Sequence, residues 1–174
     1  RRGALAVFDP GRVTGLPTAR WTPLREVTTT TGAARAARAL SQAIPRHGVN
    51  GGDFWASHGE TLIGAYMALA GLSQLLPSSV DEQGDEGATL TIDRLAEWAY
   101  THVGLSDPTV NDLIRQGLEM DRPLETRLLA KDVATKLKAF QAEDPRIRAS
   151  IYATARLALD PWTEPAVAHS ASTV

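Results

Sequence analysis

The chain has 174 residues, of which 43% are hydrophobic and 22% charged, and it contains no cysteine. This length suits one domain with its own core, and the hydrophobic share argues against wholesale disorder. The lack of cysteine excludes disulfides and thiolate metal sites and fits a reducing compartment. No run approaches the roughly 20 apolar residues that a membrane-spanning helix needs. We therefore expect the chain to lie in the cytoplasm.

Charge is distributed unevenly along the chain, although the net charge is only −2. Residues 1–77 carry eight Arg against four acidic residues, a balance of +4. Residues 78–121 carry two Arg against ten acidic residues (−8), and residues 122–156 carry eight Lys or Arg against four acidic residues (+4). This distribution predicts a polarised surface, with three independently solvated regions as the alternative.

The first residues have a pattern typical of a strand. Residues 4–8 form a short apolar run that is closed by Asp9, Pro10 and Gly11. One strand cannot form a sheet, so either its partner strands lie outside this sequence or the run packs as an extended arm on the helices. The prolines, glycines and threonines of residues 11–31 predict irregular structure.

Helical patterns dominate after residue 31 and predict a mainly helical fold, a single bundle of about six helices. The first helix covers residues 32–44, with Thr30 or Thr31 as its N-cap. Asp53 is expected to cap the second, which runs to about Leu76. Apolar residues cover nearly all sides of this second helix, which is typical of the buried centre of a bundle.

Four more helices follow. Thr91 caps the first of them, and two of the others begin at Asp107-Pro108 and Asp144-Pro145, where a cap residue precedes a proline in the first helical position. Pro123 opens the remaining one. Its expected inward residues are Leu124, Leu128, Leu129, Val133, Leu137 and Phe140. The Ala-, Ser- and Thr-rich residues 163–174 are predicted to be a flexible tail.

The sequence contains none of the motifs that would hold a nucleotide or a metal. The glycine-rich residues 48–52 are followed by Asp53 and have no nearby lysine, so they predict a turn and not a phosphate-binding loop. The four histidines are not spaced to share a helix face, and no HExxH run occurs. We therefore expect no catalytic residue, no cofactor site and no metal site in this chain.

Two polar residues lie within the most apolar helix, His58 and Glu60. Buried polar groups must be hydrogen-bonded or paired. We expect both side chains to be buried and to link this helix to a neighbouring helix or loop. The alternative is a small helical enzyme that uses His58 and Glu60 in general acid–base chemistry.

Cations cluster toward the C-terminal half. Arg127, Lys131 and Lys138 share one side of the helix opened by Pro123, and Arg146 and Arg148 follow on the next helix. Together they are the candidate surface for DNA or an acidic partner. The alternative is the solvated face of an amphipathic helix.

Several short motifs spread over residues 4–162 resemble segments of one known family. They are Val7-Phe8-Asp9-Pro10, Trp21-Thr22-Pro23-Leu24, Gly52-Asp53-Phe54-Trp55 with Glu60 behind it, and Asp144-Pro145-Arg146 followed by Ser150-Ile151-Tyr152-Ala153-Thr154-Ala155-Arg156. In this order and spacing they resemble the coupling proteins of type IV secretion and conjugation, the TraG/TraD-like family of actinobacterial type.

The resemblance implies that the chain belongs to a larger protein. Members of this family are membrane-anchored hexameric ATPases whose nucleotide-binding domain carries an inserted all-α domain on the cytoplasmic face. Residues 1–10 would then end a strand of the nucleotide-binding domain, and residues 11–162 would be the inserted domain. ATP and Mg would bind to the parent domain, and no catalytic residue of the family can be carried over to this chain.

The resemblance also implies a function. The inserted domain is thought to recognise the transported substrate, which is DNA, its relaxase or a secreted protein. The isolated domain is expected to be a monomer because the nucleotide-binding domain builds the hexamer. The alternative from another class is a DNA-binding helical regulator that acts alone.

Overall fold

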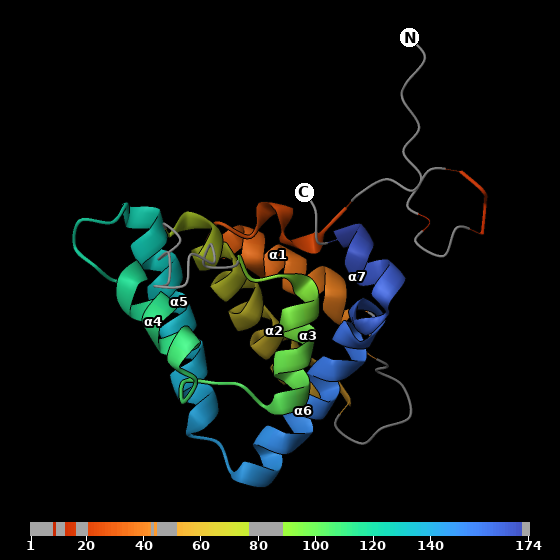
Figure 1. The fold of residues 1–174 in the computed structure, drawn as a ribbon. Coiled ribbons are helices and arrows are strands. Elements are labelled where there is room, and N and C mark those ends of the chain that lie inside the picture. The colour runs from red at the N-terminus through yellow and green to blue at the C-terminus, as the bar shows by residue number, and fades with distance from the viewer. Residues whose placement is uncertain are drawn as a thin grey trace.

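The computed structural model describes residues 9, 13–16, 21–42, 44, 52–76 and 89–171, and these residues are mainly helical (Figure 1). The predicted fold class is therefore confirmed. The strand expected over residues 4–8 lies outside the described residues. The helices are η1 (Pro23–Glu26), α1 (Thr30–Ser41), α2 (Gly52–Leu75), α3 (Ile92–Thr101), α4 (Pro108–Gly117), α5 (Leu124–Gln141), α6 (Pro145–Leu159), η2 (Asp160–Thr163) and α7 (Pro165–Ala171), where η marks a 3₁₀ helix.

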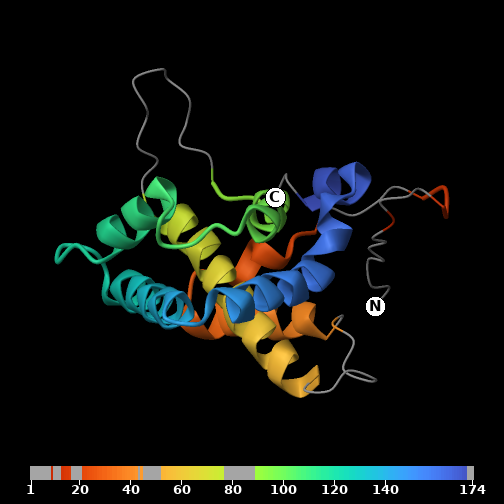
Figure 2. The ribbon, with the colours of Figure 1, turned by 90° about the horizontal axis from the view of Figure 1, so that it is seen from below.

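Helix α2 forms the centre of the bundle. It packs against α1, α4, α5 and α6, which surround it in both views (Figures 1 and 2). Every residue from position 62 to position 72 is buried. The apolar pattern on all sides of this segment is thus explained by neighbours on all sides. Of the helices in the described part of the chain, none is long and apolar enough to cross a membrane.

The segment after η1 lies against the end of α2. The Gln74 side-chain amide donates a hydrogen bond to the Leu24 carbonyl at 3.0 Å. A Cβ atom on Gly71 would lie only 2.1 Å from the Val27 carbonyl oxygen, so the contact requires glycine at this position. These two contacts fix η1 and the start of α1 on the central helix.

Two helix starts follow the predicted cap chemistry, whereas Thr91 makes no side-chain cap hydrogen bond and Asp53 lies within α2, which begins at Gly52. Asp107 Oδ1 accepts the Thr109 N–H at 2.9 Å, and Asp144 Oδ1 accepts the Arg146 N–H at 2.8 Å. Helix α1 differs from the prediction, because its N-cap is Thr29 and neither Thr30 nor Thr31. The Thr29 hydroxyl accepts the N–H of the third residue in the helix at 3.0 Å, as a threonine cap does.

The buried face of α5 differs from the predicted one. Leu124 and Leu128 are 60% and 45% exposed, so the expectation that they point inward is wrong. The buried residues are Thr126, Leu129, Ala130, Val133 and Leu137. These positions are separated by three, one, three and four residues, which keeps them on one side of the helix. Leu128 lies two residues before Ala130, about 200° around the helix, and therefore falls outside that face.

The expected flexible tail of residues 163–174 is helical over Pro165–Ala171, where the structure forms α7 with Ser170 and Ala171 buried. The backbone N–H of Trp21 donates to the Ser170 carbonyl at 3.3 Å. The rings of Trp21 and Trp162 lie 5.8 Å apart. These contacts join distant segments, so they could not be read from the local composition.

Candidate binding surfaces

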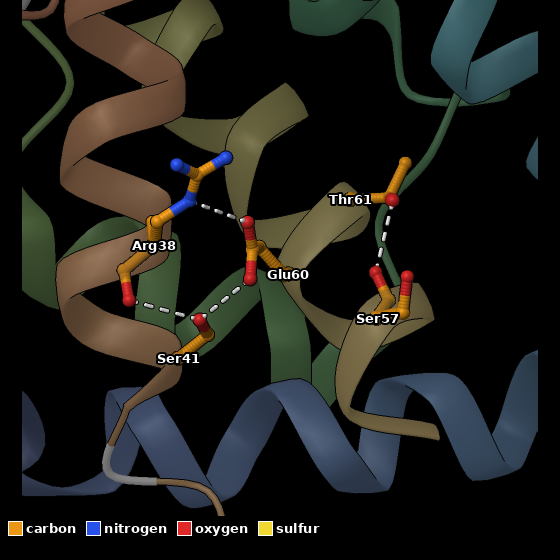
Figure 3. Close-up of polar contacts among 5 residues, drawn as sticks. All are labelled: Arg38, Ser41, Ser57, Glu60 and Thr61. Atoms are coloured by element: carbon orange, nitrogen blue, oxygen red, sulfur yellow. Dashed lines mark hydrogen bonds and ion pairs between the residues drawn. The ribbon is translucent and has the colours of Figure 1, made fainter. Parts of the chain in front are cut away.

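Glu60 links the central helix to α1, as predicted for a carboxylate in an apolar helix. Figure 3 shows Arg38 and Ser41 of α1 pointing toward it. Its Oε2 accepts the Ser41 hydroxyl at 3.0 Å, and its Oε1 lies 3.5 Å from Arg38 Nε. The Glu60 side chain is 28% exposed, so the link is half-buried and not fully buried as expected.

His58 makes a different contact from the predicted one. Its Nδ1 lies 2.9 Å from the Phe54 carbonyl oxygen one turn earlier in α2, and its ring lies 4.0 Å from the Phe54 ring. The side chain is half-buried. The expectation of a buried link from His58 to a neighbouring element is therefore wrong. Two positions along a helix correspond to about 200° of rotation, so His58 and Glu60 face different neighbours.

The side chains of Glu60 and His58 line different pockets. Glu60 lines a groove of about 850 Å³ between α1 and α2, and His58 lines a pocket of about 280 Å³ between α2, α5 and α6. General acid–base chemistry by a pair of residues needs both within reach of one substrate. The structure does not bring these two residues to one pocket.

Charges in the α1–α2 groove are compensated by the protein itself. Arg38 is paired with Glu60, and Lys136 Nζ lies 2.6 Å from the Asp132 carboxylate. Small residues such as Ala34, Ala37 and Gly64 make the groove wide. Since each cation in the groove has a carboxylate partner, the groove does not favour an anionic ligand.

The predicted basic residues of α5 lie in two settings. Lys131 and Lys138 are exposed, and neither forms an ion pair within the described residues. Arg127 is half-buried, and its Nη1 lies 3.6 Å from Met120 Sδ. Arg127 therefore packs on the turn between α4 and α5, while the two lysines are available to a partner.

The two arginines of α6 do not continue the α5 row as one surface. Helices α5 and α6 meet at the turn formed by residues 142–144 and extend away from each other (Figures 1 and 2). Arg146 is exposed in the first turn of α6, whereas Arg148 is half-buried and lines a pocket beside Tyr152. The predicted five-residue surface is thus divided, because Arg148 lines this pocket while Arg146 and the α5 cations do not.

Sequence reasoning missed this pocket, which has a volume of about 260 Å³ and lies between the α3–α4 connection, α5 and α6. Its polar lining side chains are His102, Ser106, Gln141, Arg148 and Tyr152. The His102 ring stacks on the Tyr152 ring, with centroids 4.3 Å apart and planes 11° apart. We refer to it below as the His102 pocket. The one sequence signal for it is a histidine at the end of a helix, where glycine or asparagine is usual.

Two buried phenols hold the backbone beside this pocket. The Val103 carbonyl accepts hydrogen bonds from the Tyr66 hydroxyl at 2.8 Å and from the Tyr152 hydroxyl at 2.9 Å. These donors come from α2 and α6. Burial raises the pKa of both tyrosines, that of Tyr66 well above its usual value. The connection after α3 is therefore attached to two helices immediately after His102.

No group of three or more side chains suited to hold a metal occurs in the described ranges. No protein-family model, curated protein or solved structure matches the chain. The family resemblance therefore depends on the motifs themselves. In the structure, Thr22 caps η1, Gly52-Asp53-Phe54-Trp55 opens α2, and Asp144-Pro145 begins α6.

Proposed function

We propose that this chain is the substrate-recognition module of a type IV coupling ATPase and that it contacts the transferred DNA through the exposed cations of α5. The motifs that resemble this family support the first part. The second part rests on Lys131 and Lys138, which are exposed and form no ion pair with any residue in the described part of the chain. Catalysis would belong to the parent nucleotide-binding domain, which would hold ATP and Mg.

The two lysines suit a phosphate backbone. They are seven residues apart, which is two turns or about 10 Å along one side of a helix. Cations without carboxylate partners release counterions when they meet phosphates, and this release drives association. The cations of α3 and α4 differ, because Arg94 is paired with Glu97 and Arg115 with Asp112.

The acidic middle of the chain would orient the DNA. Residues 78–121 carry the balance of −8 and include α3 and α4. A polyanion is repelled from such a surface and attracted to the α5 side.

The test is the affinity for a labelled single-stranded oligonucleotide, measured by fluorescence anisotropy at several salt concentrations. We expect the double variant Lys131→Glu/Lys138→Glu to bind about tenfold more weakly, with a shallower dependence on salt, because two phosphate contacts are lost. The matched control is Arg94→Glu/Arg115→Glu, which changes the net charge equally but on the acidic side.

An equal loss of affinity in both double variants would contradict the role of α5. No saturable binding by the unaltered chain at low salt would overturn the DNA contact and favour a relaxase or a secreted protein as the substrate. The coupling-protein assignment has a separate test in the gene. We expect the reading frame to encode transmembrane segments and a GxxxxGK[ST] loop upstream of this chain.

A further inference from the structure

We infer that the His102 pocket binds one phosphate group, with Arg148 as its main cation. This inference deepens the proposed function and rests on it, because the phosphate we assign to the pocket belongs to the transferred strand. A free phosphate ion has the same chemistry and is distinguished by the test below.

The lining of the pocket is that of an anion site. Arg148 offers a guanidinium, which matches the geometry of phosphate oxygens. His102, Ser106 and Gln141 add hydrogen-bond donors, and none of the described residues that line the pocket is a carboxylate. Arg148 has no ion-pair partner among the described residues, in contrast to Arg38 in the α1–α2 groove. The cationic charge of Arg148 is therefore left for a ligand.

Carboxylates close to the pocket in sequence are engaged elsewhere. Asp107 accepts backbone N–H groups at the start of α4, and Asp144 does so at the start of α6. Glu143 lines the neighbouring pocket of His58. Pro145 and Ala149 place the first turns of α6 at the pocket wall, where the positive end of the helix dipole also favours an anion.

The backbone at His102 is held in an unfavourable conformation. Its φ is +58°, in the left-handed region that favours glycine. Such a conformation costs free energy and persists only where the surroundings impose it. Here the two tyrosine hydroxyls on the Val103 carbonyl and the stacking on Tyr152 impose it. This backbone conformation holds the imidazole in the lining of the pocket. A glycine at this position would leave no side chain there.

Size limits the ligand to a small group. At about 260 Å³ the pocket lies below the usual range of about 300–1,000 Å³ for drug-sized ligands. A single phosphate fits this scale. Lys131 and Lys138 belong to α5, the helix whose Leu137 and Gln141 line the pocket, so a longer strand could contact both sites.

The test uses two variants of the full chain, His102→Gly and Arg148→Gln. Glycine suits the left-handed backbone, which offsets part of the lost stacking on Tyr152, so we expect His102→Gly to remain folded with a melting temperature within a few degrees of the unaltered chain. We expect each variant to bind the labelled single strand about tenfold more weakly, as for the loss of one charge-assisted contact. Arg94→Gln is the matched control and should bind normally.

A second readout uses inorganic phosphate. We expect it to shift the imidazole proton resonances of His102 saturably, and Arg148→Gln to weaken this titration. If both variants bind the strand normally while Lys131→Glu/Lys138→Glu does not, the inference is overturned and the proposed function stands. If inorganic phosphate shifts the His102 resonances saturably but both variants bind the strand with unchanged affinity, the pocket binds a free anion. The assignment of the pocket to the strand is then overturned. If the unaltered chain binds no strand, the DNA contact of α5 and the assignment of the pocket to the strand are both overturned.

Discussion

Replacing Gly71 with alanine is expected to lower the free energy of unfolding by about 1–3 kcal/mol, although alanine is the better helix former. The new Cβ would lie 2.1 Å from the Val27 carbonyl oxygen and 2.8 Å from its carbon. Both atoms are backbone, so the segment after η1 must move away from α2. That movement would also strain the bond from Gln74 to the Leu24 carbonyl.

The control for this change is Gly64→Ala in the same helix. A Cβ there would meet only ordinary contacts, at 3.6 Å from Ala37 Cβ and 3.8 Å from Lys136 Nζ. We expect Gly64→Ala to raise stability by up to about 1 kcal/mol through helix propensity alone. Urea unfolding measures both variants. Shifts of the same sign and size would contradict the close approach of α2 and Val27.

The chain is expected to lose stability at alkaline pH because of Tyr66. Burial raises the pKa of this tyrosine well above 10.0, so the unfolded chain loses the phenolic proton first. The stabilising contribution of Tyr66 is therefore complete below about pH 10. It falls by up to about 1.4 kcal/mol per pH unit as the pH rises from there toward the native pKa.

Tyr66→Phe removes this titration. We expect the variant to lose about 0.5–1.5 kcal/mol near pH 7, because the Val103 carbonyl keeps only the donor from Tyr152. Between pH 10 and 12 its stability should fall less steeply than that of the unaltered chain. Denaturant unfolding across this pH range measures the difference, and parallel curves would show that Tyr66 does not titrate as the structure requires.

Local signals in the sequence were enough to predict most of the helices. Asp107 and Asp144 cap the helices that were predicted from an Asp-Pro pair, because a cap acts within three residues. The all-round apolar pattern of α2 predicted its central place. By contrast, α7 contacts Trp21 through the Ser170 carbonyl, and these two residues are far apart in the chain.

The candidate sites were harder to predict than the helices. Glu60 was expected to link α2 to a neighbour because an apolar helix leaves a carboxylate few partners, and it does so. The His58 ring instead contacts the Phe54 carbonyl oxygen of its own helix. The five predicted cations were grouped by their order along two helices, but the angle between α5 and α6 separates them. The His102 pocket needs three elements in contact, and no local pattern indicates it.

The measurement that tests the central claim most directly is the change in backbone amide chemical shifts while a single-stranded oligonucleotide is titrated into the chain. We expect the largest saturable changes in chemical shift around Lys131 and Lys138 on α5 and around His102 and Arg148 at the pocket. The acidic surface of α3 should change little. Changes confined to the α1–α2 groove, or none at low salt, would contradict a recognition module that contacts DNA through α5.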